Sequence, residues 1–206
     1  MTDVEATVDT MVDVAFPLDG THLPRDHAWP LARALAEYLP WLAAEPLAGI
    51  HPVKVVPGYG VRGLLSQRAR LLLRVPGPRV PALATLAGRS LSVSGCALRV
   101  GEPKPRGLLP HGTLFAPVVG AESADEASFM RAVAETLRAL QIDAHTVCGR
   151  RHQIGAPAGP TIGFSLMLHG LSAADSLRVQ CVGIGPQRLL GCGIFVPHRS
   201  AAAAGA

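Results

Sequence analysis

The order of apolar patterns along the chain most restricts its possible folds, because the same succession of strand and helix signals occurs twice. In the first pass, an alternating segment, MVDVAFP at 11–17, predicts a strand. Apolar residues spaced near 3.6 then predict a helix at about 27–42. The complete first pass predicts strands at 11–17, 50–56, 70–75 and 91–100 and helices at about 27–42 and 80–86.

The second pass has the same order. Ser123 with Glu126, and Ser172 with Asp175, match the capping box that begins a helix. The second pass predicts strands at 113–119, 146–154, 161–169 and 189–196 and helices at about 125–140 and 173–181.

Each pass therefore has the order β-α-β-β-α-β, which predicts an antiparallel sheet with two helices on one face, the ferredoxin-like unit. We expect an α+β protein of two such units in tandem. The segment GEPKPRGLLP at 101–110 is rich in proline and glycine, as linkers are. The predicted domains are 11–101 and 112–198, with a linker at 102–111, a flexible leader at 1–10 and a flexible tail at 199–206.

Composition excludes several other classes of protein. The chain has 206 residues, which suits one large domain or two small domains of about 100 residues each. No apolar run approaches the ~18 residues of a membrane helix. No basic segment precedes an apolar stretch near Met1, so we expect no secretory signal and a cytoplasmic location. The four cysteines form no C-x-x-C motif, which argues against a disulfide framework.

The charge is unevenly distributed. The formal net charge is +4, but the first 13 residues hold four of the 15 acidic residues and no basic one, which leaves +8 on the rest. Of the 19 basic residues, only Lys54 and Lys104 are lysines. Coding bias is one explanation of this arginine excess, and the other is functional, because arginine is the better ligand for phosphate and for stacked bases. The body of the chain is therefore compatible with a polyanionic partner.

A glycine-rich segment, GIGPQRLLGCG at 183–193, stands before the last predicted strand. Four glycines in eleven residues are costly unless the backbone needs positive φ or a close approach. Bare amides at Gly183, Gly185, Gly191 and Gly193 can line a concavity for phosphates, with Arg188 to supply charge. The segment matches neither a Walker loop nor the dinucleotide fingerprint. A glycine-rich hairpin without a ligand is the alternative.

This segment, on this architecture, resembles the repeat-processing endoribonucleases of CRISPR systems, the sixth CRISPR-associated protein family, in a compact subtype. The resemblance covers nearly the whole chain, roughly Val12 to Pro197. It implies metal-independent cleavage within the repeats of CRISPR precursor RNA, by attack of the 2′-hydroxyl on the adjacent phosphate. The other stretches that carry it are LPRDH at 23–27, GIHP at 49–52, the run from Ser66 to Arg74, and GCGIFVPH at 191–198.

Such a reaction needs a base for the 2′-hydroxyl and a proton or positive charge for the leaving oxygen. His27 is our first candidate, because it lies at the start of the first predicted helix, where the helix dipole disfavours a charged imidazole. A surface histidine that serves the helix start is the alternative. His51, which starts the next strand, is the second candidate, with a structural role at a strand edge equally open. His22 is a third, weaker candidate.

Arginines are the candidate RNA ligands. Arg68, Arg70 and Arg74 share one face of a predicted strand by alternation, as either a solvated surface or a track for the RNA backbone. Arg150 and Arg151 predict a basic arm. Aromatic residues are only 4% of the chain, which argues against base stacking on a sheet. We therefore expect the arginines and the glycine-rich segment to recognise the shape of a hairpin repeat RNA.

Metals and cofactors are not expected. His145, Cys148 and His152 form H-x2-C-x3-H, but no local fourth ligand completes a structural zinc site. The sequence has no cofactor fingerprint. Two alternatives to an enzyme that cleaves CRISPR repeats remain. One is a non-catalytic guide-RNA-binding subunit of a CRISPR interference complex, and the other is a small-molecule α+β enzyme. Other subunits of such a complex are possible partners, whereas a membrane is not.

Overall fold

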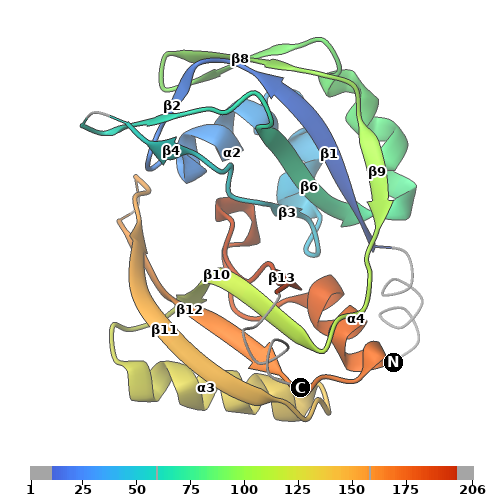
Figure 1. Ribbon diagram of the computed structural model, residues 1–206, viewed down its shortest axis with the longest axis vertical. Coiled ribbons are helices and arrows are strands. Elements are labelled where there is room, and N and C mark those ends of the chain that lie inside the picture. Colours follow the sequence, from blue (N-terminus) through green and yellow to red (C-terminus); the bar gives the residue numbers. More distant parts are fainter. Residues whose placement is uncertain (1–10, 59, 158, 199–206) are drawn as a thin grey trace. The chain divides into compact units, whose positions relative to one another are not determined.

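The computed structural model describes residues 11–58, 60–157 and 159–198, which divide into two compact units (Figure 1). The first unit runs to Gly107 and takes in short later segments that include Leu189–Gly191. The second unit begins at Leu108. The predicted leader at 1–10 and tail at 199–206 lie outside the described residues. No helix in the described ranges is long and apolar enough to cross a membrane.

The first unit has the ferredoxin-like order of strands. Its main antiparallel sheet runs β3-β6-β1-β8-β7, so that its first strand lies at the centre. A small separate sheet has the order β2-β5-β4. The elements are β1 (Met11–Asp19), β2 (His22–Pro24), α2 (Ala28–Ala36), η1 (Pro40–Ala44), β3 (Gly49–Ile50), β4 (Val56–Pro57), β5 (Arg62–Leu64), β6 (Arg70–Pro76), η2 (Gly77–Leu86), β7 (Ser90–Val93), β8 (Cys96–Val100) and β9 (Lys104–Gly107).

Alternation along β1 and β6 divides the residues of the sheet between its two faces. Val14 and Phe16 of β1 and Leu73 of β6 are fully buried in the core of the unit. Leu31 and Leu35 of α2 pack into the same core, as does η2 through Leu83 and Leu86. Asp13 of β1 and Arg74 of β6 alternate with these core residues and therefore lie on the face away from the helices.

Proline explains where the predicted helix and strand of this unit are wrong. The helix predicted at 27–42 ends at Ala36, and a short 3-10 helix begins at Pro40. Leu39, which precedes this proline, has φ −128° and ψ 64°, outside the helical region. The strand predicted at 50–56 is reduced to Gly49–Ile50, since Pro52 has no N–H to donate to a ladder.

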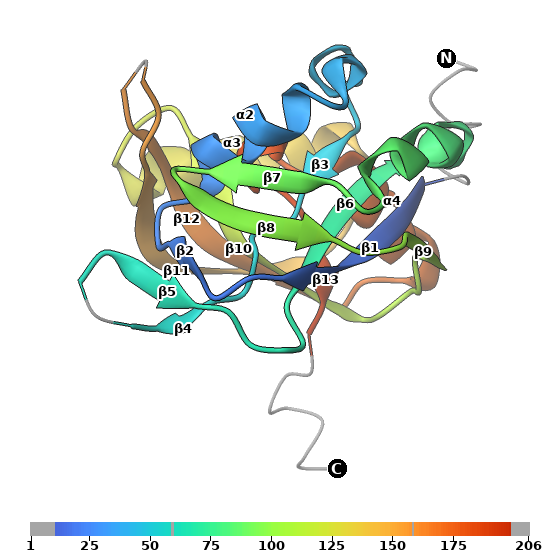
Figure 2. The same ribbon diagram turned by 90° about the horizontal axis from the view of Figure 1, so that it is seen from above.

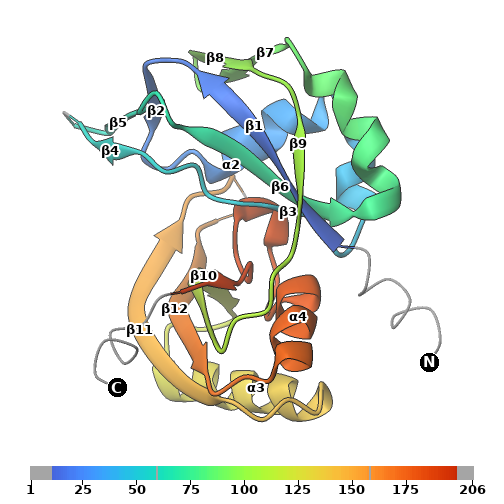
Figure 3. The same ribbon diagram turned by 45° about the vertical axis from the view of Figure 1, so that its right-hand side comes forward.

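Two further differences concern turns and edges. The strand predicted at 91–100 is a hairpin, β7–β8, whose turn residues Ser94 and Gly95 have φ of 48° and 78°. Positive φ at both positions is typical of a type I′ turn. Figure 2 shows this hairpin in bright green. Within the predicted linker, β9 pairs with β1, opposite Val12 to Ala15, and Figure 3 shows the two strands side by side.

The second unit repeats the ferredoxin-like order, with an antiparallel sheet β11-β12-β10-β13. Phe129, Val133 and Leu137 of α3 pack on Leu166 and on other apolar residues of the sheet. The elements that begin in this unit are β10 (Thr113–Ala121), α3 (Glu126–Ala139), β11 (His145–Ile154), β12 (Thr161–His169), α4 (Ala173–Val182), η3 (Arg188–Leu190) and β13 (Val196–Pro197).

The last predicted strand, 189–196, is wrong. Residues 188–190 form a 3-10 turn, and Gly191 and Gly193 have φ of 84° and 66°, which no strand residue adopts. Only Val196–Pro197 pairs with β10.

The two predicted helix caps differ in outcome. Ser172 is the N-cap of α4, and its hydroxyl accepts from the N–H of Asp175 at 3.1 Å. Ser123, however, is not the cap of α3. Asp125 is, because its carboxylate accepts from the N–H of Ser128 at 2.8 Å.

We predict that Ser172→Ala lowers the free energy of unfolding by about 1 kcal/mol, because it removes the acceptor at the start of α4. Ser123→Ala is the matched control, and we expect it to cost less than about half of that, since it caps no helix. Urea unfolding of both variants measures the difference. Equal losses would contradict these cap assignments.

Candidate functional site

A buried ion pair connects the two central strands of the first unit. Asp13 of β1 lies directly opposite Arg74 of β6 in the antiparallel register. Arg74 Nε donates to Asp13 Oδ1 at 2.7 Å, and Nη2 donates to Oδ2 at 2.9 Å. Arg74 is fully buried, at 0% exposed. The two bonds form the bidentate pairing that fixes an arginine most firmly on a carboxylate.

His51 joins the same carboxylate. Its Nε2 lies 3.1 Å from Asp13 Oδ1, and since a carboxylate only accepts, Nε2 carries a proton. Burial by itself would raise the pKa of Asp13, but the hydrogen bonds and charges of Arg74 and His51 hold that pKa well below its usual range. Asp13 is therefore ionised and orients the His51 ring.

His27 is held from two sides. It is the N-cap residue of α2, and its Nδ1 lies 2.9 Å from the carbonyl oxygen of Pro24. The N–H of Val53 donates to its Nε2 at 3.2 Å. These partners require a neutral imidazole with the proton on Nδ1 and the lone pair on Nε2. Because Val53 is two residues after His51, the bond places both histidines in one part of the unit.

This arrangement can both accept and donate a proton. His27 has a basic lone pair on Nε2, and His51 has a proton on Nε2 next to a carboxylate. The two residues are 6% and 8% exposed, so little of either is open to a reacting group. His27 can accept a proton from a ligand only if Nε2 releases the Val53 N–H. His22, the third candidate, is half-buried, and its Nδ1 lies 2.8 Å from Thr21 Oγ1.

The structure does not place the three predicted arginines on one exposed face. Arg68 is exposed in the turn before β6, and Arg70 is half-buried with Nη1 donating to the carbonyl of Ala69. Arg74 belongs to the buried pair, so the prediction of a solvent-facing side chain there is wrong. Arg150 and Arg151 are both exposed on β11. As neighbours along a strand, they point to opposite faces.

The backbone of the glycine-rich segment is as its composition predicts. Gly183, Gly185, Gly191 and Gly193 have φ of 73°, 77°, 84° and 66°. This region is open to glycine at no steric cost. The exposed part of the segment is its tip, residues 185–187.

Arg188 does not face solvent from this segment. It is 9% exposed, and Nη1 donates to the carbonyl of Val182 at 2.8 Å and Nη2 to that of Cys181 at 3.2 Å. The expectation that its charge is offered at the surface is therefore wrong, because the guanidinium is turned toward the end of α4.

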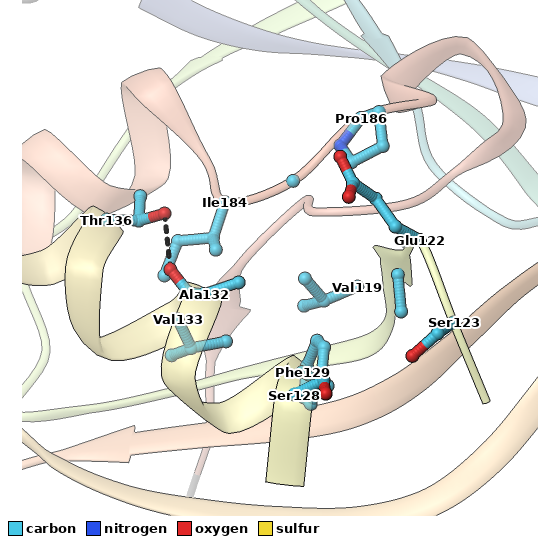
Figure 4. A pocket seen from close by; sticks show the side chains of 13 residues that line it. Val119, Glu122, Ser123, Ser128, Phe129, Ala132, Val133, Thr136, Ile184 and Pro186 are labelled. Carbon is cyan, nitrogen blue, oxygen red and sulfur yellow. Dashed lines mark hydrogen bonds between the residues drawn. The ribbon is translucent and has the colours of Figure 1, made fainter. Parts of the chain in front are cut away.

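A cavity of about 450 Å³ lies within the second unit beside the tip of the glycine-rich segment (Figure 4). Val119, Phe129 and Ile184 form apolar walls, and Pro186 lies at one side. Glu122 is its charged lining residue, so the cavity would repel a phosphate. Among the residues that the structure describes, no three His, Cys, Asp or Glu side chains are grouped to hold a metal.

Two antiparallel ferredoxin-like units in tandem, with a glycine-rich segment after the last helix, define the class of fold. Solved structures of this class include a Cas6-related protein of Pyrococcus furiosus (12% identical, TM-score 0.64, 90% of this chain and 98% of that one). Another is Thermus thermophilus Cse3 bound to an RNA that represents a pre-cleavage complex (16% identical, TM-score 0.51, 91% and 98%). At such identities these structures show the fold alone.

Sequence comparison is more specific. The Cas6 family model, described as Cas6 Crispr, matches residues 12–200. The CRISPR-associated endonuclease Cas6 of Myxococcus xanthus is 39% identical over 193 residues, which are 93% of this chain and 83% of that protein. The chain therefore belongs to the Cas6 family.

Sequence reasoning missed Asp13. The available signal was an acidic residue inside an otherwise apolar alternating strand, at a position on the face away from the helices. Its partner Arg74 was identified, but as a surface ligand. Only the register of β1 against β6 shows that the two residues are opposed.

We predict that Asp13→Asn lowers the free energy of unfolding at pH 7 by about 3–5 kcal/mol, because it leaves the buried Arg74 charge uncompensated. Because the pKa of Asp13 is lower in the folded state than in the unfolded chain, where it is about 3.9, its ionisation stabilises the folded wild type at pH values above about 4. This contribution is lost as the pH falls below about 4. The wild type should therefore lose more stability than the variant between pH 7 and pH 3, as urea unfolding measures.

The control is Glu45→Gln, which removes a pair with Arg79, a side chain that is 46% exposed. Its cost should stay below about 1 kcal/mol. A cost for Asp13→Asn as small as this would show that the buried pair does not stabilise the unit.

Proposed function

We propose that this protein is an endoribonuclease that cleaves CRISPR precursor RNA within its repeats to give mature guide RNA. The observation that carries the proposal is the 39% identity to the Myxococcus xanthus Cas6 endonuclease, which extends over both units. The Thermus Cse3 structure supports it, since a protein with this fold binds RNA there before cleavage.

The proposed chemistry needs no metal ion. The 2′-oxygen attacks the adjacent phosphorus as its proton passes to a base, and the bond from phosphorus to the 5′-oxygen breaks as that oxygen gains a proton. The products are a 2′,3′-cyclic phosphate and a 5′-hydroxyl. Two groups that transfer protons and several hydrogen-bond donors are sufficient for such a reaction.

We assign the base to His27 and the proton donor to His51. The assignment is supported by the hydrogen bonds of each ring. Pro24 holds the His27 proton on Nδ1, which leaves a lone pair on Nε2. Asp13 accepts from His51 and stabilises its protonated form. The substrate hydroxyl would replace the Val53 N–H at His27, as catalytic hydrogen bonds often tighten only in the complex.

Exposed arginines would bind the RNA backbone. Arg68, Arg150 and Arg151 are free of the buried contacts that hold Arg74, and Arg70 is half-exposed. The exposed tip of the glycine-rich segment would add backbone amides. We expect the substrate repeat to form a hairpin, recognised by shape and through phosphates.

The alternative is a non-catalytic guide-RNA-binding subunit of an interference complex. One observation favours it: both histidines are almost buried, and Nε2 of His27 is already bonded to Val53. Cleavage experiments separate the two proposals.

We predict that His27→Ala and His51→Ala each slow repeat cleavage by ~10²–10⁴-fold while RNA affinity stays within about threefold of the wild type. The measurement is single-turnover cleavage of a repeat transcript in EDTA. His22→Ala is the control and should cleave at nearly the wild-type rate.

A substrate with a single 2′-deoxy nucleotide at the cut should bind without being cleaved. Full activity of both histidine variants would remove the assigned roles. Binding without cleavage by the wild type would favour the non-catalytic subunit.

We predict that Arg150→Ala and Arg151→Ala each weaken RNA binding uniformly across sequences and reduce the salt slope of log K by about 0.7–1. Binding titrations at several salt concentrations measure this. Arg138→Ala, at an exposed position near the end of α3, is the control and should leave the slope unchanged. Equal slopes for all variants would exclude β11 from the RNA interface.

A further inference from the structure

We propose that Arg188 is a positioning residue that clamps the glycine-rich segment into shape and does not touch RNA. The inference rests on the proposed RNA-binding function, because the segment that Arg188 shapes would be one of its RNA contacts. A basic side chain in the middle of a glycine-rich loop would ordinarily be assigned to a phosphate.

The contacts of Arg188 lie inside the second unit. Its guanidinium donates to the carbonyls of Cys181 and Val182 in the last turn of α4 and lies 3.5 Å from the carbonyl of Gly193. The planar guanidinium thus connects the end of α4 with Gly193, the last residue of the glycine-rich segment. Carbonyls at a helix C-terminus lack partners within the helix and carry partial negative charge, so a cation there is stabilising.

The glycines make room for this clamp. A Cβ at Gly183 would collide with Arg188 Nη1 and with the carbonyl oxygen of Gly193. A Cβ at Gly193 would collide with the carbonyl of Ile184. These close approaches within the protein, together with positive φ, account for glycine at both positions. A phosphate ligand is not required to explain them.

Burial leaves Arg188 little means to reach a ligand. It is 9% exposed, and its hydrogen bonds to the carbonyls of Val182 and Cys181 point toward the protein. To meet a phosphate it would have to leave the helix end. Lysine could not replace it, since a single ammonium on a flexible stem cannot reproduce a planar fork that bonds several carbonyls.

By fixing the rest of the glycine-rich segment, these contacts leave its tip, residues 185–187, exposed. Gly193 N–H donates to the carbonyl of Val118 at 2.8 Å, and Cys192 N–H donates to that of Gln187 at 3.2 Å. Gly185, Pro186 and Gln187 remain exposed, and Gln187 has φ of 68°. Contacts between the segment and RNA would therefore be made by this tip.

The test compares lysine and glutamine at two arginines, Arg188 and the exposed Arg151. Arg188→Lys and Arg188→Gln should each lower RNA affinity at least about tenfold, to the same extent, with an unchanged salt slope. Arg151→Lys should keep most of the affinity, whereas Arg151→Gln should lower the slope by about 0.7–1. Amide hydrogen exchange at Cys192 and Gly193, without RNA, should be at least tenfold faster in both Arg188 variants and unchanged in both Arg151 variants.

Rescue by Arg188→Lys, with a lower slope in Arg188→Gln and unchanged exchange, would overturn the proposal and make Arg188 a phosphate ligand. If the wild type binds no RNA, the proposed function fails, but the exchange rates still decide the clamp: faster exchange supports it and unchanged exchange overturns it. Failure of both Arg188 variants to fold, beside folded Arg151 variants, would support the structural role.

Discussion

The ion pair between Asp13 and Arg74 is the contact on which the first unit most depends. It joins the two central strands at opposed positions, so it fixes the register of β1 against β6. A slip of β1 by one residue would move Val14 and Phe16 out of the core and leave the buried guanidinium of Arg74 without its carboxylate. The same carboxylate orients His51. Strand register and the proposed proton donor are therefore linked through one side chain.

The second unit depends on a different constraint, the close approach of backbone segments around the end of α4. Gly183 and Gly193 allow the two arms of the glycine-rich segment to meet, and Arg188 bonds to the carbonyls that the helix leaves open. The positive charge of Arg188 therefore stabilises the C-terminal end of α4. Because Arg74 and Arg188 are buried, they leave the set of candidate RNA ligands, and exposed arginines such as Arg150 remain candidates.

The architecture was predictable because each unit carries its own apolar periodicity. The strand at 161–169 agrees residue for residue, and Ser172 caps α4 as its spacing predicts. Local chemistry limited the rest: Pro40 and Pro52 interrupt regular patterns, and Gly191 and Gly193 break the last strand. For the site, residue type identified His27, His51 and the four glycines. Residue type could not distinguish buried from exposed arginines. The partner of Arg74, Asp13, is distant in sequence, and the carbonyls that Arg188 bonds are brought to it only by the folded chain.

Membership of the Cas6 family and the two buried histidines of the first unit support the proposal that this chain cleaves repeat RNA through its own side chains. The most direct measurement is end-group analysis of a repeat transcript incubated with the wild-type protein in EDTA. We predict one cut per repeat, leaving a 2′,3′-cyclic phosphate and a 5′-hydroxyl. Cleavage that requires a divalent cation and leaves a 5′-phosphate would contradict it.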